Sequence, residues 1–141
     1  TTCLHNYHKS EESLNAKLNA IERRAKEETP RVCSFDINTC GAAIGLGVFL
    51  STYLNRELVD EDEWTLSNQI TAQALKKIAE AGAPRCCKRD TYLSIQSAIE
   101  FLKEHFAVEL PYAEAKCTFS LRNRTCKHEE CQFYNLSNSM V

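Results

Sequence analysis

The sequence contains little glycine and little proline. Its 141 residues include four glycines and three prolines, and no low-complexity tract or fixed repeat is present. This composition excludes collagen-like and solenoid structures and argues against disorder. A chain of this length buries about two thirds of the surface that its unfolded form exposes. We therefore predict a compact globular domain with a core of its own.

The chain also lacks an excess of charge of either sign and a long apolar run. Seventeen Lys and Arg stand against nineteen Asp and Glu, which gives a net charge of −2. Nucleic-acid-binding domains carry a basic field, so nucleic acid is not expected as a partner. The longest apolar stretch, residues 42–54, contains Ser51 and Thr52 and is shorter than the ~20 residues that cross a bilayer. We expect no membrane span.

Several catalytic motifs are missing as well. The sequence has no G-x-S-x-G, no P-loop, no dinucleotide fingerprint and no Ser-His-Asp order. A classical hydrolase or kinase is therefore not predicted, and whether the domain is an enzyme stays open. The chain starts Thr-Thr-Cys-Leu without an initiator methionine or an apolar signal region, so we expect it to be a piece of a longer protein.

The hydrophobic periodicity predicts a mainly α-helical fold in which the connections between helices carry cysteines. Leu14, Leu18, Ile21 and Ala25 recur at helical spacing within residues 11–28, and Ser10 is a plausible N-cap. Similar patterns predict helices over 40–55, 60–81 and 90–105, whereas no segment alternates with period two. Gly82 and Pro84 stop the third helix, and the last thirty residues are predicted as loops with one short strand or helical turn.

We divide the chain into residues 1–32, an amphipathic helix with its flanks, and residues 33–141, a cysteine-rich helical domain. The apolar stripe of the first helix is too short to predict a coiled coil, although self-association is possible. Gly41, Gly45 and Gly47 weaken the helix over 40–55, each by up to ~1 kcal/mol relative to alanine. They indicate either a tight helix crossing or room for a cofactor beside Cys40.

The abundant residue is cysteine, with eight copies, and three interpretations compete. A secreted disulfide framework is favoured by the even count and by two glycosylation sequons, at residues 123–125 and 135–137. Cys86 and Cys87 are adjacent, which strains a disulfide between them. The cysteines lie at Cys3, Cys33, Cys40, Cys86, Cys87, Cys117, Cys126 and Cys131.

A structural zinc site is the second interpretation. Cys126 and Cys131 are separated by four residues, at the edge of the usual ligand spacing, and His128 lies between them. No C-x2-C pair is present to complete such a site. Zinc would here stabilise a binding or regulatory module without catalytic activity.

The third interpretation is an iron–sulfur cluster or a redox-active thiol site. Cys40 is predicted in the first turn of its helix, where the dipole favours a thiolate. Positive charge flanks the other cysteines, since Arg85, Lys88 and Arg89 surround Cys86 and Cys87. Arg122, Arg124 and Lys127 do the same for Cys126. Such cations would offset the charge of an anionic cluster or activate an exchange thiol.

Three segments carry a resemblance to known families. CGAAIGLGVF, PRCCKR with its flanks, and the C-x8-C-x4-C pattern of Cys117, Cys126 and Cys131 lie within residues 39–134. They resemble an uncharacterised cysteine-rich domain family of anaerobic bacteria and archaea, in which the domain occurs alone or attached to radical-SAM and methyltransferase modules. They are also distantly similar to a redox family with a Cys…Gly-Cys-Ala-x-x-Gly…Cys…Cys pattern.

The resemblance implies a cytoplasmic, oxygen-poor setting and a metal or redox role. The residues that would carry this role are Cys40, Cys86, Cys87, Cys117, Cys126 and Cys131, whereas Cys3 and Cys33 lie outside the matching motifs. No reaction follows from the resemblance.

We therefore expect a 4Fe–4S cluster ligated by four of these six thiols. Because Cys86 and Cys87 point in different directions, one could ligate the cluster while the other stays free or serves a second metal. The function would be electron transfer with a redox partner. It could instead be cluster-assisted chemistry on a small sulfur-containing or anionic substrate held by Arg85, Lys88 or Arg89.

Overall fold

Four α-helices follow the four periodic segments of the sequence. The computed structural model describes residues 10–28, 39–54 and 61–135, and this part of the chain contains no β-strand. The prediction of a mainly helical fold is confirmed. The helices are α2 over Glu11–Arg23, continued by the π-helical turn η1 over Arg24–Glu28, α3 over Gly41–Leu54, α4 over Glu61–Ala81 and α5 over Cys87–Phe106.

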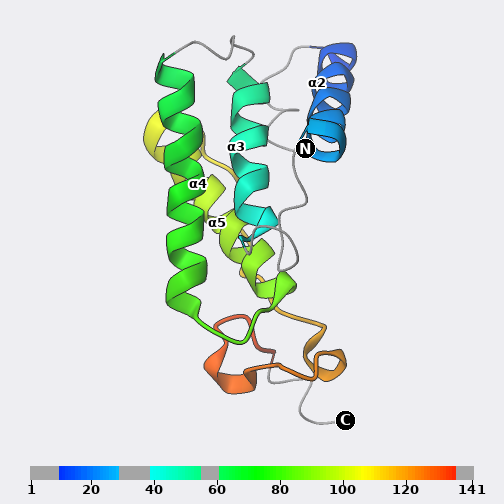
Figure 1. The fold of residues 1–141 in the computed structure, drawn as a ribbon, viewed down its shortest axis with the longest axis vertical. Coiled ribbons are helices and arrows are strands. Elements are labelled where there is room, and N and C mark those ends of the chain that lie inside the picture. Colours follow the sequence, from blue (N-terminus) through cyan, green and yellow to red (C-terminus); the bar gives the residue numbers. More distant parts are fainter. Residues whose placement is uncertain (1–9, 29–38, 55–60, 136–141) are drawn as a thin grey trace.

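α3, α4 and α5 form a bundle in which α4 runs opposite to its two neighbours (Figure 1). Both α3 and α5 therefore begin at the end of the bundle where α4 ends. The core between the three helices consists of fully buried apolar side chains, each of which contributes about 1.5–3 kcal/mol by leaving water. These are Leu50, Ile70, Phe101, Leu102 and Val108.

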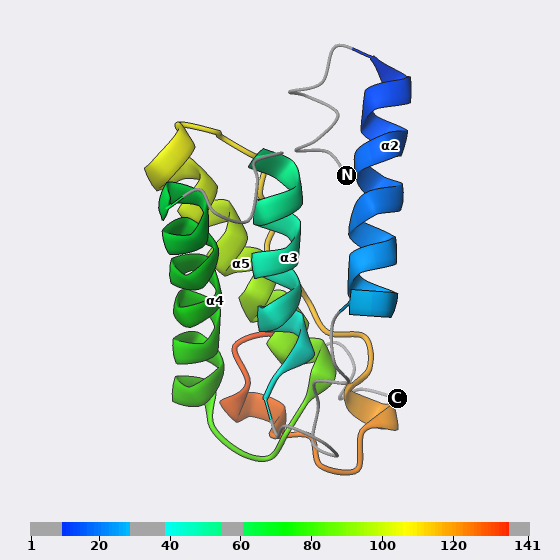
Figure 2. The same cartoon turned by 45° about the horizontal axis from the view of Figure 1, so that its top comes forward.

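α2 lies along the outer side of α3 (Figure 2). Ser10 caps it as predicted, because its Oγ accepts a hydrogen bond from the N–H of Ser13 at 3.2 Å. Lys17 Nζ donates to the carbonyl oxygen of Tyr53 at 2.7 Å, and burial lowers the pKa of this lysine. Arg24 Nη1 donates to Ser51 Oγ at 2.6 Å. Polar contacts thus fasten α2 to the end of α3.

Gly47 marks a close crossing of α3 and α4. A Cβ atom at this position would lie 2.7 Å from Thr71 Oγ1 and 3.3 Å from the carbonyl oxygen of Ser67. Gly45, on the same helix, has no neighbouring atom within 4 Å of such a Cβ. The tight helix crossing is therefore the explanation for Gly47, and Gly45 has no packing reason of this kind.

A buried arginine holds the turn between α4 and α5. α4 ends as predicted, with Gly82 in the left-handed region at φ 67°. Arg89 Nη2 donates to the carbonyl oxygens of Gly82 at 2.6 Å and Pro84 at 3.0 Å, while its Nε lies 3.3 Å from Asp90 Oδ1. Arg89 and Asp90 are 5% and 4% exposed, so the turn is built on a buried ion pair.

α5 begins three residues before the predicted start. Cys86 is its N-cap in an extended conformation, and Cys87 is its first residue. The predicted helix starts at Asp90, after the PRCCKR motif, and cysteine is not a usual N-cap residue that would mark an earlier start. Asp90 lies instead in the first turn, where its negative charge suits the helix dipole. The prediction that the cysteines lie in connections is therefore wrong for Cys87.

The C-terminal segment returns along the bundle and covers its lower end (Figures 1 and 2). The chain leaves α5 through Ala107, at φ 52°, and the N–H of Val108 donates to the carbonyl oxygen of Leu102 at 3.1 Å. Residues 115–135, which we call the cap, are loops with two 3₁₀ turns, η2 over Ser120–Arg122 and η3 over His128–Glu130. No described helix has the length and apolar character needed to cross a membrane.

Candidate functional site

The cap and the start of α5 enclose a cavity of about 310 Å³. Cys86 and Cys87 reach it from α5, and three further cysteines reach it from the cap. Five of the six cysteines singled out by the sequence thus line one space. The lining consists of Arg85, Cys86, Cys87, Lys88, Arg89, Tyr92, Cys117, Phe119, Ser120, Arg122, Asn123, Thr125, Cys126, Lys127, Cys131, Phe133 and Tyr134.

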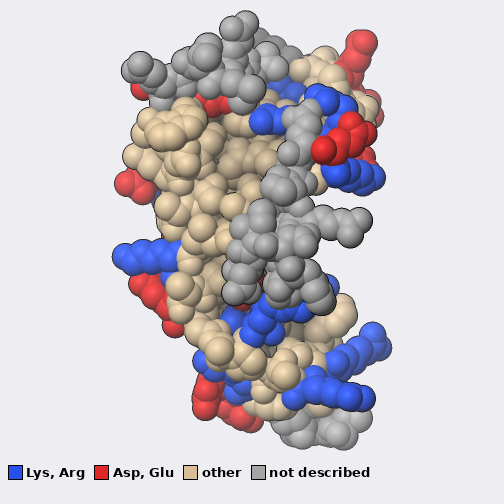
Figure 3. All heavy atoms as spheres, viewed as in Figure 1, with Lys and Arg blue, Asp and Glu red and all other residues tan. Residues whose placement is uncertain are grey.

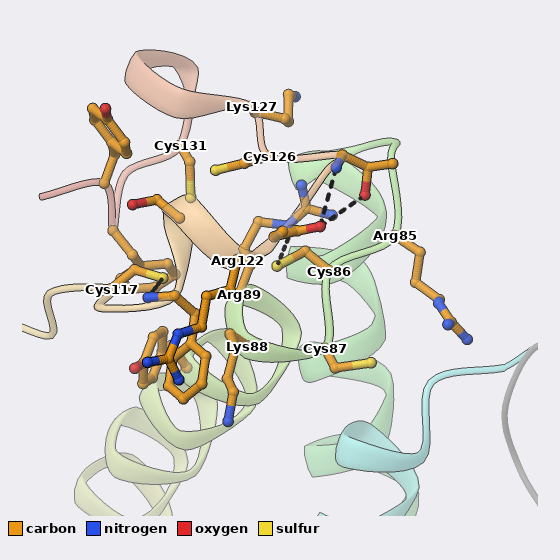
Figure 4. A pocket seen from close by; sticks show the side chains of 17 residues that line it. Arg85, Cys86, Cys87, Lys88, Arg89, Cys117, Arg122, Cys126, Lys127 and Cys131 are labelled. Atoms are coloured by element: carbon orange, nitrogen blue, oxygen red, sulfur yellow. Dashed lines mark hydrogen bonds between the residues drawn. The ribbon is translucent and has the colours of Figure 1, made fainter. Parts of the chain in front are cut away.

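Four of the five sulfurs face a common centre. In the close view, the thiols of Cys86, Cys117, Cys126 and Cys131 point toward one another across the cavity, and Cys87 points to the other side of the α5 start (Figure 4). The adjacent cysteines therefore diverge, as expected from the first turn of a helix. Cys87 is exposed, whereas the other four are half-buried.

Three of these four sulfurs accept hydrogen bonds. Cys117 Sγ accepts from the N–H of Phe119 at 3.4 Å, and Cys126 Sγ accepts from the N–H of His128 at 3.4 Å. His128 adopts a left-handed conformation, φ 49°, which is unusual for a residue with a side chain. Backbone N–H donors two residues beyond a cysteine stabilise negative charge on its sulfur and fix its position.

The third acceptor is Cys86, whose donor comes from the cap. Asn123 Nδ2 lies 3.6 Å from Cys86 Sγ. Asn123 and Thr125 were noted in the sequence as part of a glycosylation sequon, and the contact of Asn123 with Cys86 was not predicted. The proximity of the sequon to Cys126 was the only signal in the sequence that these residues could belong to the site.

The cavity lining is basic. Among its residues, five are Lys or Arg and none is Asp or Glu, and Lys and Arg side chains gather around the cap on the face seen in Figure 3. Lys88 Nζ lies 4.1 Å from the centroid of the Phe119 ring, and Lys127 Nζ donates to the carbonyl oxygen of Ala81 at 3.2 Å. Arg85 points away from the four thiols (Figure 4). Such a lining suits an anionic occupant.

The predicted residues outside this group are Cys40, Cys3 and Cys33. Cys40 directly precedes α3, where its carbonyl oxygen accepts the first helical hydrogen bonds, from Ala43 and Ile44. It does not line the cavity, although α3 and α5 begin at the same end of the bundle. Cys3 and Cys33 lie outside the described residues. The six described cysteines are all free thiols, so no disulfide joins them.

The thiols of the lining are donors of the type that zinc sites and iron–sulfur clusters both use. A zinc ion needs four ligands that converge to about 2.3 Å for sulfur. Within residues 10–28, 39–54 and 61–135, no three His, Cys, Asp or Glu side chains stand in positions to hold one metal ion. The four thiols instead surround an open space, with N–H donors on three sulfurs and cations in the walls.

Fold and cavity together define a mainly helical, cysteine-rich domain with thiols from two distant segments around one space. A family model described as a family of unknown function, DUF5714, matches residues 1–134. The chain belongs to this family, and the expectation of an uncharacterised domain family is confirmed. No curated protein and no solved structure matches the chain significantly.

Proposed function

We propose that the cavity holds an iron–sulfur cluster of the 4Fe–4S type, ligated by Cys86, Cys117, Cys126 and Cys131. When bound, such a cluster supplies one-electron transfer at a potential that its surroundings set. The observation that carries the proposal is the arrangement of these four thiols around one cavity of about 310 Å³. A cluster is several atoms across, so its ligands stand farther apart than those of a single zinc ion.

The hydrogen bonds to sulfur support the same proposal. The N–H groups of Phe119 and His128, together with Asn123 Nδ2, donate to three of the four sulfurs. Donors of this kind offset the negative charge that a cysteine-ligated cluster carries and raise its reduction potential. The positive charge of the cavity lining also offsets the charge of the cluster and raises its reduction potential.

Two roles are compatible with this centre. The cluster would exchange electrons with a redox partner, or it would act on a small sulfur-containing or anionic substrate. Arg85, Lys88 and Arg89 line the cavity, and their charge suits an anion. Because the guanidinium of Arg89 already bonds the turn between α4 and α5, Lys88 is the cation that we favour for holding a substrate.

The proposal includes a cytoplasmic and oxygen-poor setting. Cytoplasmic proteins keep their cysteines reduced, and the six described cysteines are free. Cys87 is exposed and points away from the proposed ligands, so it would remain a free thiol beside the cluster.

Anaerobic purification followed by metal and acid-labile sulfide analysis tests the proposal. We expect about four iron and about four sulfide per chain after reconstitution, with broad visible absorption. Stoichiometric zinc together with unfolding by a chelator would establish a zinc-stabilised module instead. A flat visible spectrum without iron or sulfide after reconstitution would exclude a cluster.

A further inference from the structure

We propose that Asn123 is a positioning residue for Cys86. Its carboxamide joins the cap to the one proposed ligand that comes from the helical bundle. The part of this inference that concerns a bound cluster rests on the function proposed above, whereas the contact between the two side chains does not.

The orientation of the Asn123 side chain is fixed at its oxygen. Oδ1 accepts hydrogen bonds from the N–H of Thr125 at 3.1 Å and from Thr125 Oγ1 at 3.0 Å. An asparagine amide has one accepting and one donating end. Because Thr125 occupies the accepting end, the donating end, Nδ2, faces Cys86 Sγ at 3.6 Å (Figure 4).

Cys86 depends on a distant partner more than Cys117 and Cys126 do. Cys117 and Cys126 receive N–H groups from their own turns, two residues along the chain. Cys86 is an N-cap residue whose side chain makes no capping hydrogen bond. Its donor lies 37 positions away in the sequence. Asn123 therefore fixes the Cys86 thiol relative to the cap and places a donor where a ligating sulfur carries negative charge.

This role gives the Asn-x-Thr triplet a function within the site. A glycosylated asparagine would carry its sugar on Nδ2, the atom that faces the sulfur. Asn123 is half-buried and lines the cavity. The triplet thus serves as a clamp in which Thr125 holds the amide and the amide holds the thiol.

The variant Asn123→Asp tests the clamp, because it keeps the size of the side chain and the oxygen that Thr125 binds but replaces the donor by a carboxylate oxygen. Asn68→Asp is the control, because it makes the same chemical change on α4, where Nδ2 of Asn68 donates to the carbonyl oxygen of Trp64. Thr125→Val removes one of the two anchors of the amide and leaves Asn123 in place.

The first readout needs no metal. The full chain, freed of metal, is treated with iodoacetamide, and mass spectrometry follows each cysteine. The sulfur reacts with iodoacetamide in its negatively charged form. The loss of one hydrogen bond to a charged group corresponds to about a tenfold change in rate. We expect Asn123→Asp to slow alkylation of Cys86 about tenfold while Cys87 changes by less than about twofold. Thr125→Val should have a smaller effect in the same direction, and Asn68→Asp none.

The second readout is the reduction potential of the reconstituted cluster. Replacing the donor by a carboxylate disfavours the more negative, reduced state, so the potential of Asn123→Asp should become more negative. A tenfold effect corresponds to about 59 mV for one electron. Asn68→Asp should keep the wild-type potential.

The two readouts separate the failure of each proposal. A wild-type chain without iron after reconstitution overturns the cluster, and the alkylation rates then decide the role of Asn123. An Asn123→Asp chain with wild-type alkylation of Cys86 overturns the clamp even where iron is bound. If Asn123→Asp does not fold, Thr125→Val takes its place, and wild-type behaviour of that variant in both readouts overturns the inference.

Discussion

The N–H of Cys117 donates to the carbonyl oxygen of Phe133 at 2.7 Å and so ties together the two ends of the loop that carries Cys126 and Cys131. Phe133 is 3% exposed, and its ring lies 5.1 Å from that of Tyr92 on α5. One buried aromatic residue thus anchors three thiols to the helix at whose start the fourth is found.

This arrangement predicts that metal removal loosens the cap and leaves the bundle intact. The core lies among α3, α4 and α5, whereas the cap contributes little apolar material besides Phe133. Metal binding energy stabilises the segments that the ligands join. Hydrogen exchange of loaded and metal-free protein should therefore show faster exchange over residues 115–135 and unchanged protection in α4 and α5. Equal loss of protection in all helices would contradict this division.

Arg89 is predicted to be essential for the turn that presents Cys86. Arg89→Met removes the donors to Gly82 and Pro84 and leaves the Asp90 carboxylate buried without its partner. Breaking a buried pair in this way costs about 3–5 kcal/mol. Urea unfolding should show this loss.

Arg124→Met is the matched control for that loss, because Arg124 is an exposed cation in the cap. Its unfolding free energy should change by less than ~0.5 kcal/mol. Equal stability of the Arg89 and Arg124 variants would show that the turn does not depend on Arg89.

Two of the three glycines of α3, Gly45 and Gly47, should respond to alanine in opposite directions. In Gly47→Ala, the new methyl group meets Thr71 Oγ1, which is itself held by a 2.8 Å hydrogen bond to the carbonyl oxygen of Ser67. Overpacking of this kind costs about 1–3 kcal/mol. Gly45→Ala meets no atom and should gain about 0.5–1 kcal/mol from helix propensity. Thermal unfolding of both variants checks the prediction, and a stabilised Gly47→Ala would refute the close crossing.

The helices could be predicted because each has a clear apolar period and a local stop signal. The end of α4 at Ala81, before Gly82, is an example. The start of α5 could not be predicted from the sequence, because the N-cap at Cys86 depends on the turn that Arg89 holds. This turn is formed by tertiary contacts.

The sequence predicts the types of residue in the site, cysteines and cations, but not which of them line the cavity. The sequence pointed to Cys40 because it is predicted in the first turn of a helix, and to Cys86 because cations flank it. Only the folded chain brings residue 86 to the cap and leaves Cys40 out of the cavity lining. Asn123 was missed because its contact with Cys86 spans 37 positions.

The iron content of two neighbouring variants, Cys86→Ala and Cys87→Ala, tests the central claim most directly. Cys86 faces the other three thiols, and Cys87 points away from them (Figure 4). Alanine at position 86 removes no capping hydrogen bond, so the helix start is preserved. After anaerobic reconstitution, we predict that Cys86→Ala retains less than about half of the wild-type iron and sulfide, because one of about four cluster ligands is lost. Cys87→Ala and Cys40→Ala should each retain the full wild-type iron and sulfide. Full iron in Cys86→Ala, or its loss in Cys87→Ala, would contradict the assignment of Cys86, Cys117, Cys126 and Cys131 as the ligands.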